Sequence, residues 1–305
     1  GIAVGMATNM PPHNLSEVVD GIIAYIDNND ITISELMEYI KAPDFPTGGI
    51  IYGYEGVKDA FETGRGRIVL RANTTIEEHN GHERIIATSV PYLTNKADMI
   101  KRTADLIGEK KLDGIADIRD ESDRNGLRIV YDLKRDAVSS VVLNKLFQMT
   151  GLQSSFSVNN VCLVNGRPYT LNLKQLIQYY VEHRHQCVVR RTQHDLREAE
   201  KRAHILEGLA RAIDIVDEII ATIRACKGGS QEAKQALMDQ YGFDDPQASA
   251  IVAYRLGQLA SLEIKKIMDE LEELHKLIAH LKEVLASPAM QYDIIKKELL
   301  YIKEK

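Results

Sequence analysis

The sequence predicts an α+β protein: a domain of helices and antiparallel hairpins, then a long antiparallel pair of helices that carries a small helical tip. Three Asn-Gly dipeptides, at 80–81, 125–126 and 165–166, separate strand-like runs, and this dipeptide is the strongest short signal for a hairpin turn. After residue 173 the two-residue period disappears. A seven-residue apolar repeat over residues 264–285 then indicates a coiled-coil seam.

The elements of the first 172 residues follow from local signals. Residues 1–13 form a loop rich in Gly, Pro and Asn, and Asn14 stands three residues before Glu17, the spacing of a capping box, so a helix is expected through Ile26. A shorter helix ends before Pro43. Further helices are expected near 95–109 and 137–149, between the hairpins 67–78/83–90, 115–120/127–134 and 155–164/167–172.

The last 133 residues read as helix. Apolar residues of the returning arm alternate spacings of three and four, which is the period of a coiled coil: Ile264, Ile267, Leu271, Leu274, Ile278, Leu281 and Leu285. The outgoing arm has a broken seam: Leu176, Tyr180, Val188, Leu196, Ala199, Ala203 and Leu206. The expected domains are therefore 1–172, the outgoing arm 173–206, a helical tip 207–257, and the returning arm with a terminal helix, 258–305.

Composition places the 305-residue chain among folded soluble proteins, with 44% hydrophobic and 27% charged residues. The cysteines Cys162, Cys187 and Cys226 form no Cys-x-x-Cys pair, which argues against a disulfide framework and a zinc ribbon. No apolar run approaches the roughly 20 residues that span a bilayer, and the N-terminus lacks a secretory pattern. We therefore expect a cytoplasmic protein without a membrane partner.

The charge is distributed unevenly. The net charge is −6, yet residues 61–204 carry 23 Lys and Arg against 18 Asp and Glu. The flanking segments are acidic, with 2 against 9 in residues 1–60 and 13 against 17 in residues 205–305. Such an asymmetry predicts one basic surface on an acidic molecule.

Candidate nucleic-acid contacts lie within this basic segment. Arg65 and Arg67, in the run 63–67, are expected on a flexible turn at the mouth of a hairpin, where they suit phosphate oxygens; a solvated turn is the alternative. Lys96 opens a lysine-containing helix that could extend the patch.

Two candidate metal sites have simpler explanations. The run 119–124 is rich in carboxylates, but arginines are interleaved with them, so a network of ion pairs is the better interpretation. His183 and Cys187 lie one helical turn apart and could be half of a zinc site, although no second pair of ligands accompanies them. The glycine-rich run 48–56 has no nucleotide-binding pattern.

The first fourteen residues, Gly-Ile-Ala-Val-Gly-Met-Ala-Thr-Asn-Met-Pro-Pro-His-Asn, closely resemble a signature of the A subunits of bacterial type IIA topoisomerases. Further matches are spread along nearly the whole chain, at 43–47, 63–66, 119–123, 134–137 and 202–209. The resemblance implies a tower domain of mixed α/β structure, a coiled-coil hairpin, and a tip globule that dimerises as the exit gate, or C-gate. Asn9 and the short linker of the tip favour DNA gyrase over topoisomerase IV.

The same resemblance assigns residues. Ile2 is the apolar wedge that kinks the gate duplex, an insertion whose cost is offset by the contacts that bent DNA gains. Thr8 and Asn9 contact DNA beside it. At the tip, Tyr254, Leu256 and Leu259 match the C-gate segment, with burial inside one chain as the alternative.

The resemblance also implies what the chain does not supply. The family's nucleophile is the tyrosine of an Arg-Tyr pair on a winged-helix domain, and this sequence has no such pair, so no catalytic residue and no metal ligand is assigned and the chain alone is expected to be inactive. Mg2+ and ATP are expected on the gyrase B subunit, in an A2B2 complex that acts on double-stranded DNA. A coiled-coil interaction scaffold without a nucleic-acid role is the alternative from another class.

Overall fold

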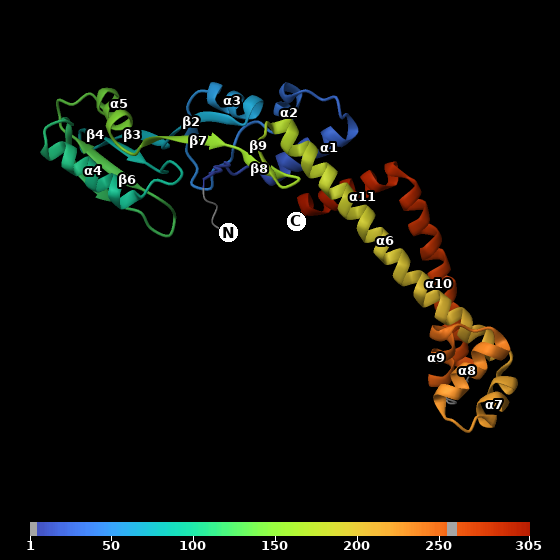
Figure 1. Cartoon of the computed structure of the whole chain (residues 1–305). Coiled ribbons are helices and arrows are strands. Elements are labelled where there is room, and N and C mark those ends of the chain that lie inside the picture. The colour runs from blue at the N-terminus through green and yellow to red at the C-terminus, as the bar shows by residue number, and fades with distance from the viewer. Residues whose placement is uncertain (1–4, 255–260) are drawn as a thin grey trace. The chain divides into compact units, whose positions relative to one another are not determined.

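The computed structural model describes residues 5–254 and 261–305. The chain divides into two compact units, residues 1–182 with 300–305 and residues 183–299. Helices α6 (Leu173–Asp214) and α11 (Pro288–Glu304) each belong partly to one unit and partly to the other. Figure 1 labels most elements of both units.

The first unit begins with helices α1 (Leu15–Asp27) and α2 (Ile33–Tyr39). The side chain of Asn14 accepts hydrogen bonds from the N–H groups of Ser16 and Glu17 and so caps α1. The predicted capping box is only half right, because the carboxylate of Glu17 accepts from the backbone N–H of Lys41 instead. A complete box, Thr32 with Glu35, starts α2.

Two sheets organise the rest of this unit. Sheet A has the order β1-β2-β7, where β1 is Ile50–Ile51, β2 Arg65–Arg71 and β7 Gln153–Asn159. Sheet B has the order β3-β4-β6-β5, formed by Thr74–His79, His82–Ala87, Ile129–Leu133 and Ile115–Asp120 in that order. A ribbon pairs β8 (Val161–Val164) with β9 (Arg167–Thr170). All pairings named here are antiparallel.

The hairpin turns are confirmed, but two predicted runs are wrong in extent. Asn80-Gly81 and Asn165-Gly166 have positive φ at both residues, as type I′ turns require. Asn125-Gly126 also joins two paired strands, but only Gly126 has a positive φ, of 140°, so this turn is not of type I′. The run 67–78 is two strands in different sheets, interrupted where the N–H of Ala72 donates to the carbonyl of Leu152. The run 155–164 is likewise split, at Asn160. Each break is made by a partner distant in sequence, which a local pattern does not reveal.

Sheet B is covered on one face by helices α4 (Lys96–Gly108) and α5 (Ser139–Met149). The core between them joins buried residues of the strands and helices: Ile85, Ile115, Ile129, Tyr131, Met99, Leu106, Val142 and Leu146. Burial without a partner for its hydroxyl raises the pKa of Tyr131 far above the usual range. Helix α3 (Glu55–Thr63), which the sequence did not predict, packs on β2 of sheet A.

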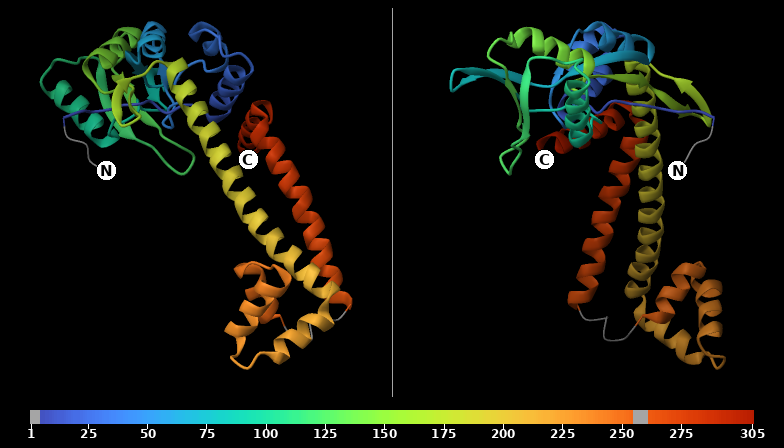
Figure 2. Two further views of the ribbon diagram at one scale, coloured as in Figure 1. Left: turned by 45° about the vertical axis from the view of Figure 1, so that its right-hand side comes forward. Right: turned by 90° about the vertical axis from the view of Figure 1, so that its left-hand side faces the viewer.

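The second unit consists of two arms and a helical tip. Its long helices are the residues of α6 from 183 onward and α10 (Ser261–Ala286), which run side by side in both views of Figure 2. The tip contains α7 (Val216–Ala225), α8 (Ser230–Tyr241) and α9 (Asp245–Ala253). Its core is built from α6 to α9: Leu206, Leu209, Ile219, Leu237, Phe243 and Ile251.

The coiled-coil seam is confirmed on α10. Its seven predicted residues, from Ile264 to Leu285, are all half-buried, and Ile267, Leu271 and Leu274 pack against the tip core. Arg202 makes two hydrogen bonds to Glu270, of 2.7 and 2.9 Å, and Lys282 pairs with Glu200 at 2.8 Å. These contacts hold α10 against α6.

The outgoing seam is partly wrong. On α6 the buried stripe uses Ile177 and Val181, whereas the predicted Tyr180 is 39% exposed. The helix also continues without a break to Asp214, eight residues beyond the predicted arm. The α+β class with a helical hairpin is confirmed. Among the described residues, no helix is long and apolar enough to cross a membrane.

Candidate nucleic-acid interface

The segment around Thr8 and Asn9 is fixed to the outer edge of sheet A. Asn9 and Asn159 exchange backbone hydrogen bonds of 2.9 and 3.0 Å, which adds a one-residue antiparallel bridge beside β7. The Thr8 hydroxyl donates to the carbonyl of Asn159 at 3.1 Å, and the Asn9 amide donates to that of Ser157 at 2.6 Å. Both side chains remain exposed. Ile2 lies outside the described residues.

Arg65 and Arg67 lie on β2 and not on the flexible turn that the sequence predicted. Every residue of β2 is paired with β7, from Arg65 opposite Asn159 to Arg71 opposite Gln153. The turn is limited to Gly64, which ends α3 with a φ of 76°. Because side chains alternate along a strand, the two arginines share one face, opposite Ser157 and Asn159.

Close packing of α3 determines which face of β2 stays open. A Cβ atom on Gly66 would lie 2.3 Å from the carbonyl oxygen of Gly56, and one on Gly56 would lie 2.0 Å from that of Arg67. Helix and strand backbones therefore touch on the Gly66 face, which glycine alone allows. The arginine face is left exposed, and its cations are held on a strand that is paired along its full length.

Neither arginine is neutralised. Among the residues that the structure describes, no carboxylate lies within ion-pair distance of Arg65 or Arg67, and neither guanidinium has a hydrogen-bond partner. Exposed guanidinium groups without a counter-ion are among the donors that proteins use for phosphate oxygens.

Lys96 does not belong to this group. It is the first residue of α4, beside sheet B, and its ammonium pairs with Asp120 at 2.7 Å. The hydrogen bond from Lys96, followed by those from the hydroxyl and N–H of Ser122, lowers the pKa of Asp120 to about 2. The charge of Lys96 is thus already compensated.

The run 119–124 forms the predicted network of ion pairs. Arg119 contacts Asp117, Glu121 and Asp132, and Arg128 bridges Glu121 and Glu77. Three carboxylates raise the pKa of Arg119 above its usual range, so it stays protonated. No group of three or more possible metal ligands occurs within residues 5–254 and 261–305.

The candidate zinc pair is a local contact. Cys187 Sγ lies 3.5 Å from His183 Nε2, one turn earlier on α6. The thiol and the imidazole on one helix interact with each other, so their proximity is explained without a metal ion.

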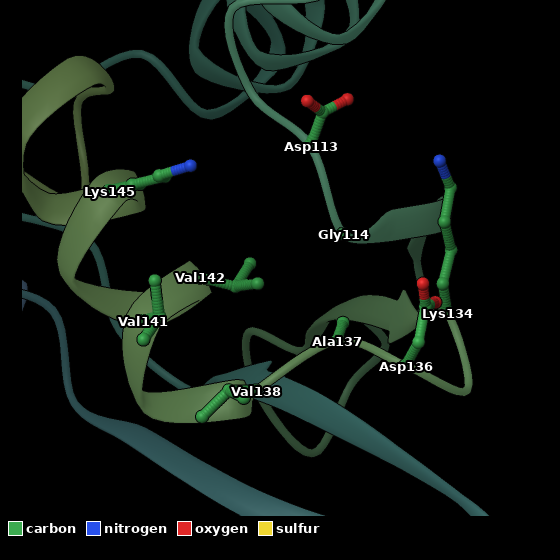
Figure 3. Close-up of a pocket in the computed structure, with 9 residues that line it drawn as sticks. All are labelled: Asp113, Gly114, Lys134, Asp136, Ala137, Val138, Val141, Val142 and Lys145. Atoms are coloured by element: carbon green, nitrogen blue, oxygen red, sulfur yellow. The ribbon is translucent and has the colours of Figure 1, made fainter.

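A shallow hollow of about 420 Å³ opens beside the N-terminus of α5. Its lining includes Lys134, Lys145, Asp113, Asp136 and valines at the start of α5, and Figure 3 shows the Lys145 and Lys134 side chains on opposite sides of the hollow. The lining holds no Ser, Cys or His.

The predicted dimer residues are only partly described. Tyr254 follows α9, is half-buried and packs against the tip core. Leu256 and Leu259 lie outside the described residues.

The sequence interpretation missed Arg71. It continues the two-residue alternation of β2 beyond Arg67, on the same face. The run Arg-Gly-Arg-Ile-Val-Leu-Arg carries this signal in full, but treating its first residues as a turn concealed it.

Comparisons with known proteins show the family of this chain. Residues 1–300 match the family model that describes the A subunit of DNA gyrase and topoisomerase IV. The DNA gyrase A subunit of Clostridium acetobutylicum is 52% identical over the whole chain, and those of Halalkalibacterium halodurans and Ureaplasma parvum are 50% and 47% identical. The chain belongs to the family of DNA gyrase and topoisomerase IV A subunits. It spans just over a third of these relatives, 36–37% of their length.

Substitution of Lys96 tests whether its ion pair with Asp120 is the main cause of the lowered Asp120 pKa. Replacing Lys96 with Met removes the largest cause of the shift, so the pKa of Asp120 should rise from about 2 towards 3.8. Because the folded-state pKa is depressed, the pair stabilises the fold above about pH 4, and the contribution disappears as the pH falls towards 2. NMR titration of the carboxyl carbon measures this shift. Lys111→Met, which unpairs Glu109 instead, should leave Asp120 unchanged; an Asp120 pKa that ignores Lys96→Met contradicts the assignment.

Proposed function

We propose that this chain is part of the breakage-reunion subunit of an ATP-dependent type II DNA topoisomerase, where it holds and bends the gate duplex and contributes the exit gate. Family membership supports the class. The relatives named above are DNA gyrase A subunits rather than topoisomerase IV subunits, which supports gyrase. Membership in this family also favours a DNA role over the alternative of a coiled-coil scaffold.

One observation carries the proposal: Arg65 and Arg67 lie on one face of β2 without a counter-ion among the described residues, and Thr8 and Asn9 are hydrogen-bonded to β7, the strand paired with β2. Phosphate contacts of this kind position a duplex without reading its sequence. A strand paired along its full length fixes the backbone that carries these arginines, so binding requires ordering of the side chains but not of the strand. An acidic protein can then bind DNA through one local surface.

The wedge role of Ile2 extends the same surface. The proposed DNA-bending loop is residues 1–13, and its described part is anchored at Asn9 by the bridge to Asn159. An anchor seven residues downstream would confine the inserted side chain to within roughly 25 Å of Asn9. Insertion of an apolar β-branched side chain unstacks a base step, at a cost of a few kcal/mol that contacts to bent DNA offset.

The partners and chemistry follow from this role. We infer duplex DNA as substrate, a gyrase B subunit in an A2B2 complex, and a second copy of the chain at the C-gate. Cleavage would use the tyrosine of an Arg-Tyr pair supplied from outside these 305 residues, with Mg2+ and ATP on the B subunit. The part played by this chain is then mechanical, with the domains 1–172, 173–206, 207–257 and 258–305 acting as tower, outgoing arm, dimerisation globule and returning arm.

The DNA-binding proposal is tested by salt dependence. Arg65→Gln and Arg67→Gln should each lower the magnitude of the slope of log K against log salt by about 0.9, because each phosphate contact releases a counterion. Fluorescence anisotropy with a labelled duplex measures this between about 50 and 200 mM salt. Arg119→Gln, which makes the same charge change within the ion-pair network, is the control. Equal slopes in all four proteins, or no salt-dependent binding by the unmodified chain, would refute the proposal.

The wedge is tested in the assembled enzyme. Ile2→Ala removes most of the inserted surface and should reduce bending severalfold more than initial association, as measured by energy transfer between the ends of a labelled duplex. Met6→Ala, which removes an exposed apolar side chain from the same loop, should not reduce bending. Undiminished bending by Ile2→Ala rules out the wedge.

The C-gate proposal predicts a dimer at micromolar concentration. Leu256→Asp or Leu259→Asp would place a charge in a buried interface, so each should convert the dimer to a monomer in sedimentation equilibrium. Leu277→Asp makes the same change at an exposed position on α10 and should leave the dimer intact. A chain that is monomeric before any substitution, or a dimer that tolerates both aspartates, removes the assignment.

A further inference from the structure

The side chain of Arg71, at the end of β2, is held by contacts with two aromatic rings and one amide. Its guanidinium carbon lies 3.4 Å from the centre of the Tyr52 ring and 4.7 Å from that of Phe147. Its Nε donates a 2.6 Å hydrogen bond to the side-chain oxygen of Gln153, the residue opposite it on β7. Two rings and an amide thus fix a side chain that ordinarily has many rotamers.

The charge of Arg71 has no counter-ion in the described part of the chain. Gln153 is neutral, and no carboxylate among the described residues reaches the guanidinium. Sheet B presents a contrast, because its Arg84, Arg119 and Arg128 all pair with carboxylates. A half-buried cation is costly unless an anion compensates it.

The terminal nitrogens of Arg71 are the unused donors. Only Nε has a hydrogen-bond partner within residues 5–254 and 261–305. The two Nη groups of a guanidinium form a planar fork that matches two oxygens of one phosphate. Stacking of Tyr52 uses the face of the guanidinium plane, and Gln153 bonds only to Nε. These contacts therefore orient the two Nη groups and leave them available to a ligand.

The position of Arg71 continues the arginine row. Arg65, Arg67 and Arg71 lie on one face of β2, because their numbers differ by two and four. At about 3.4 Å per residue, the first two Cα atoms are roughly 7 Å apart and the row is roughly 20 Å long. A row of this length spans several phosphates of one strand, each separated by about 3.4 Å along the duplex axis.

We propose that Arg71, clamped by Tyr52 and Gln153, is a further phosphate-binding site that extends the interface along β2. Its ligand is a backbone phosphate of duplex DNA, bound through the two Nη groups. This inference rests on the proposed DNA-binding function. Tyr52 and Gln153 are positioning residues, since they act on DNA only through Arg71.

Three variants of the full chain distinguish a phosphate site from a structural stack. Arg71→Gln should lower the magnitude of the salt slope by about 0.9 and weaken binding of the duplex about tenfold at low salt. Arg71→Lys keeps the charge but loses the fork, so the slope should be retained while affinity falls severalfold. Tyr52→Ala leaves the charge unchanged and should weaken binding about threefold, because the guanidinium loses its support. Thermal unfolding of each variant accompanies the binding measurement.

Arg128→Gln is the matched control, with the same change of charge in an arginine that Glu121 and Glu77 already compensate. It should not change the slope. If Arg71→Gln behaves like this control while Arg65→Gln and Arg67→Gln lower the slope, the Arg71 site is refuted and the proposed function stands. If no arginine of the row affects the slope, both are refuted. Equal weakening by Arg71→Gln and Arg71→Lys, with lower thermal stability and an unchanged slope, identifies a structural stack and also overturns the site.

Discussion

The β2–β7 ladder is the constraint on which the rest of the first unit depends. Seven residue pairs join Arg65–Arg71 to Gln153–Asn159, segments almost 90 positions apart in sequence. The outer edge of β7 receives Asn9, and the opposite edge of β2 receives β1. Because α3 touches the backbone of β2 through Gly56 and Gly66, only one face remains open, and it is the face that carries the arginines.

The two sheets differ in whether their arginines have carboxylate partners. On sheet B, cations and carboxylates neutralise one another: Arg119 with Asp117, Glu121 and Asp132, and Lys96 with Asp120 at its margin. Exposed pairs of this kind add little stability each, but they leave no free charge for a ligand. The arginines of sheet A have no such partners among the described residues. Overall charge therefore says little about binding here, since the chain is at −6 and three arginines without a carboxylate partner among the described residues still lie along one face of a single strand.

Features set by neighbouring residues could be predicted from the sequence. The Asn-Gly turns, the cap at Asn14 and the seam from Ile264 to Leu285 depend on local geometry or on one helical period. Features set by distant partners could not. Arg65 and Arg67 were expected on a turn because their partners on β7 are 94 and 90 residues away. Lys96 was expected to extend the basic patch because its partner Asp120 belongs to another element.

Helix α3 and the outgoing seam on α6 show two further reasons why the sequence alone did not predict the structure. The sequence before Thr63 is interrupted by Gly53 and Gly56, residues that ordinarily argue against a helix, but Gly56 is required for contact with β2. On α6, Leu176 and Tyr180 have the same spacing as Ile177 and Val181, and only packing of the helix decides which pair is buried. The wedge and the C-gate residues came from family resemblance alone, and Ile2, Leu256 and Leu259 lie outside the described residues.

We propose that duplex DNA supplies the missing counter-ions of β2. Phenylglyoxal modifies accessible arginines, and mass spectrometry reads the modification with and without a duplex. DNA should protect Arg65, Arg67 and Arg71 at low salt, high salt should abolish the protection, and the exposed Arg197 on α6 should react equally in every condition. If the three β2 arginines react as fast with bound DNA as without it, DNA does not supply these counter-ions.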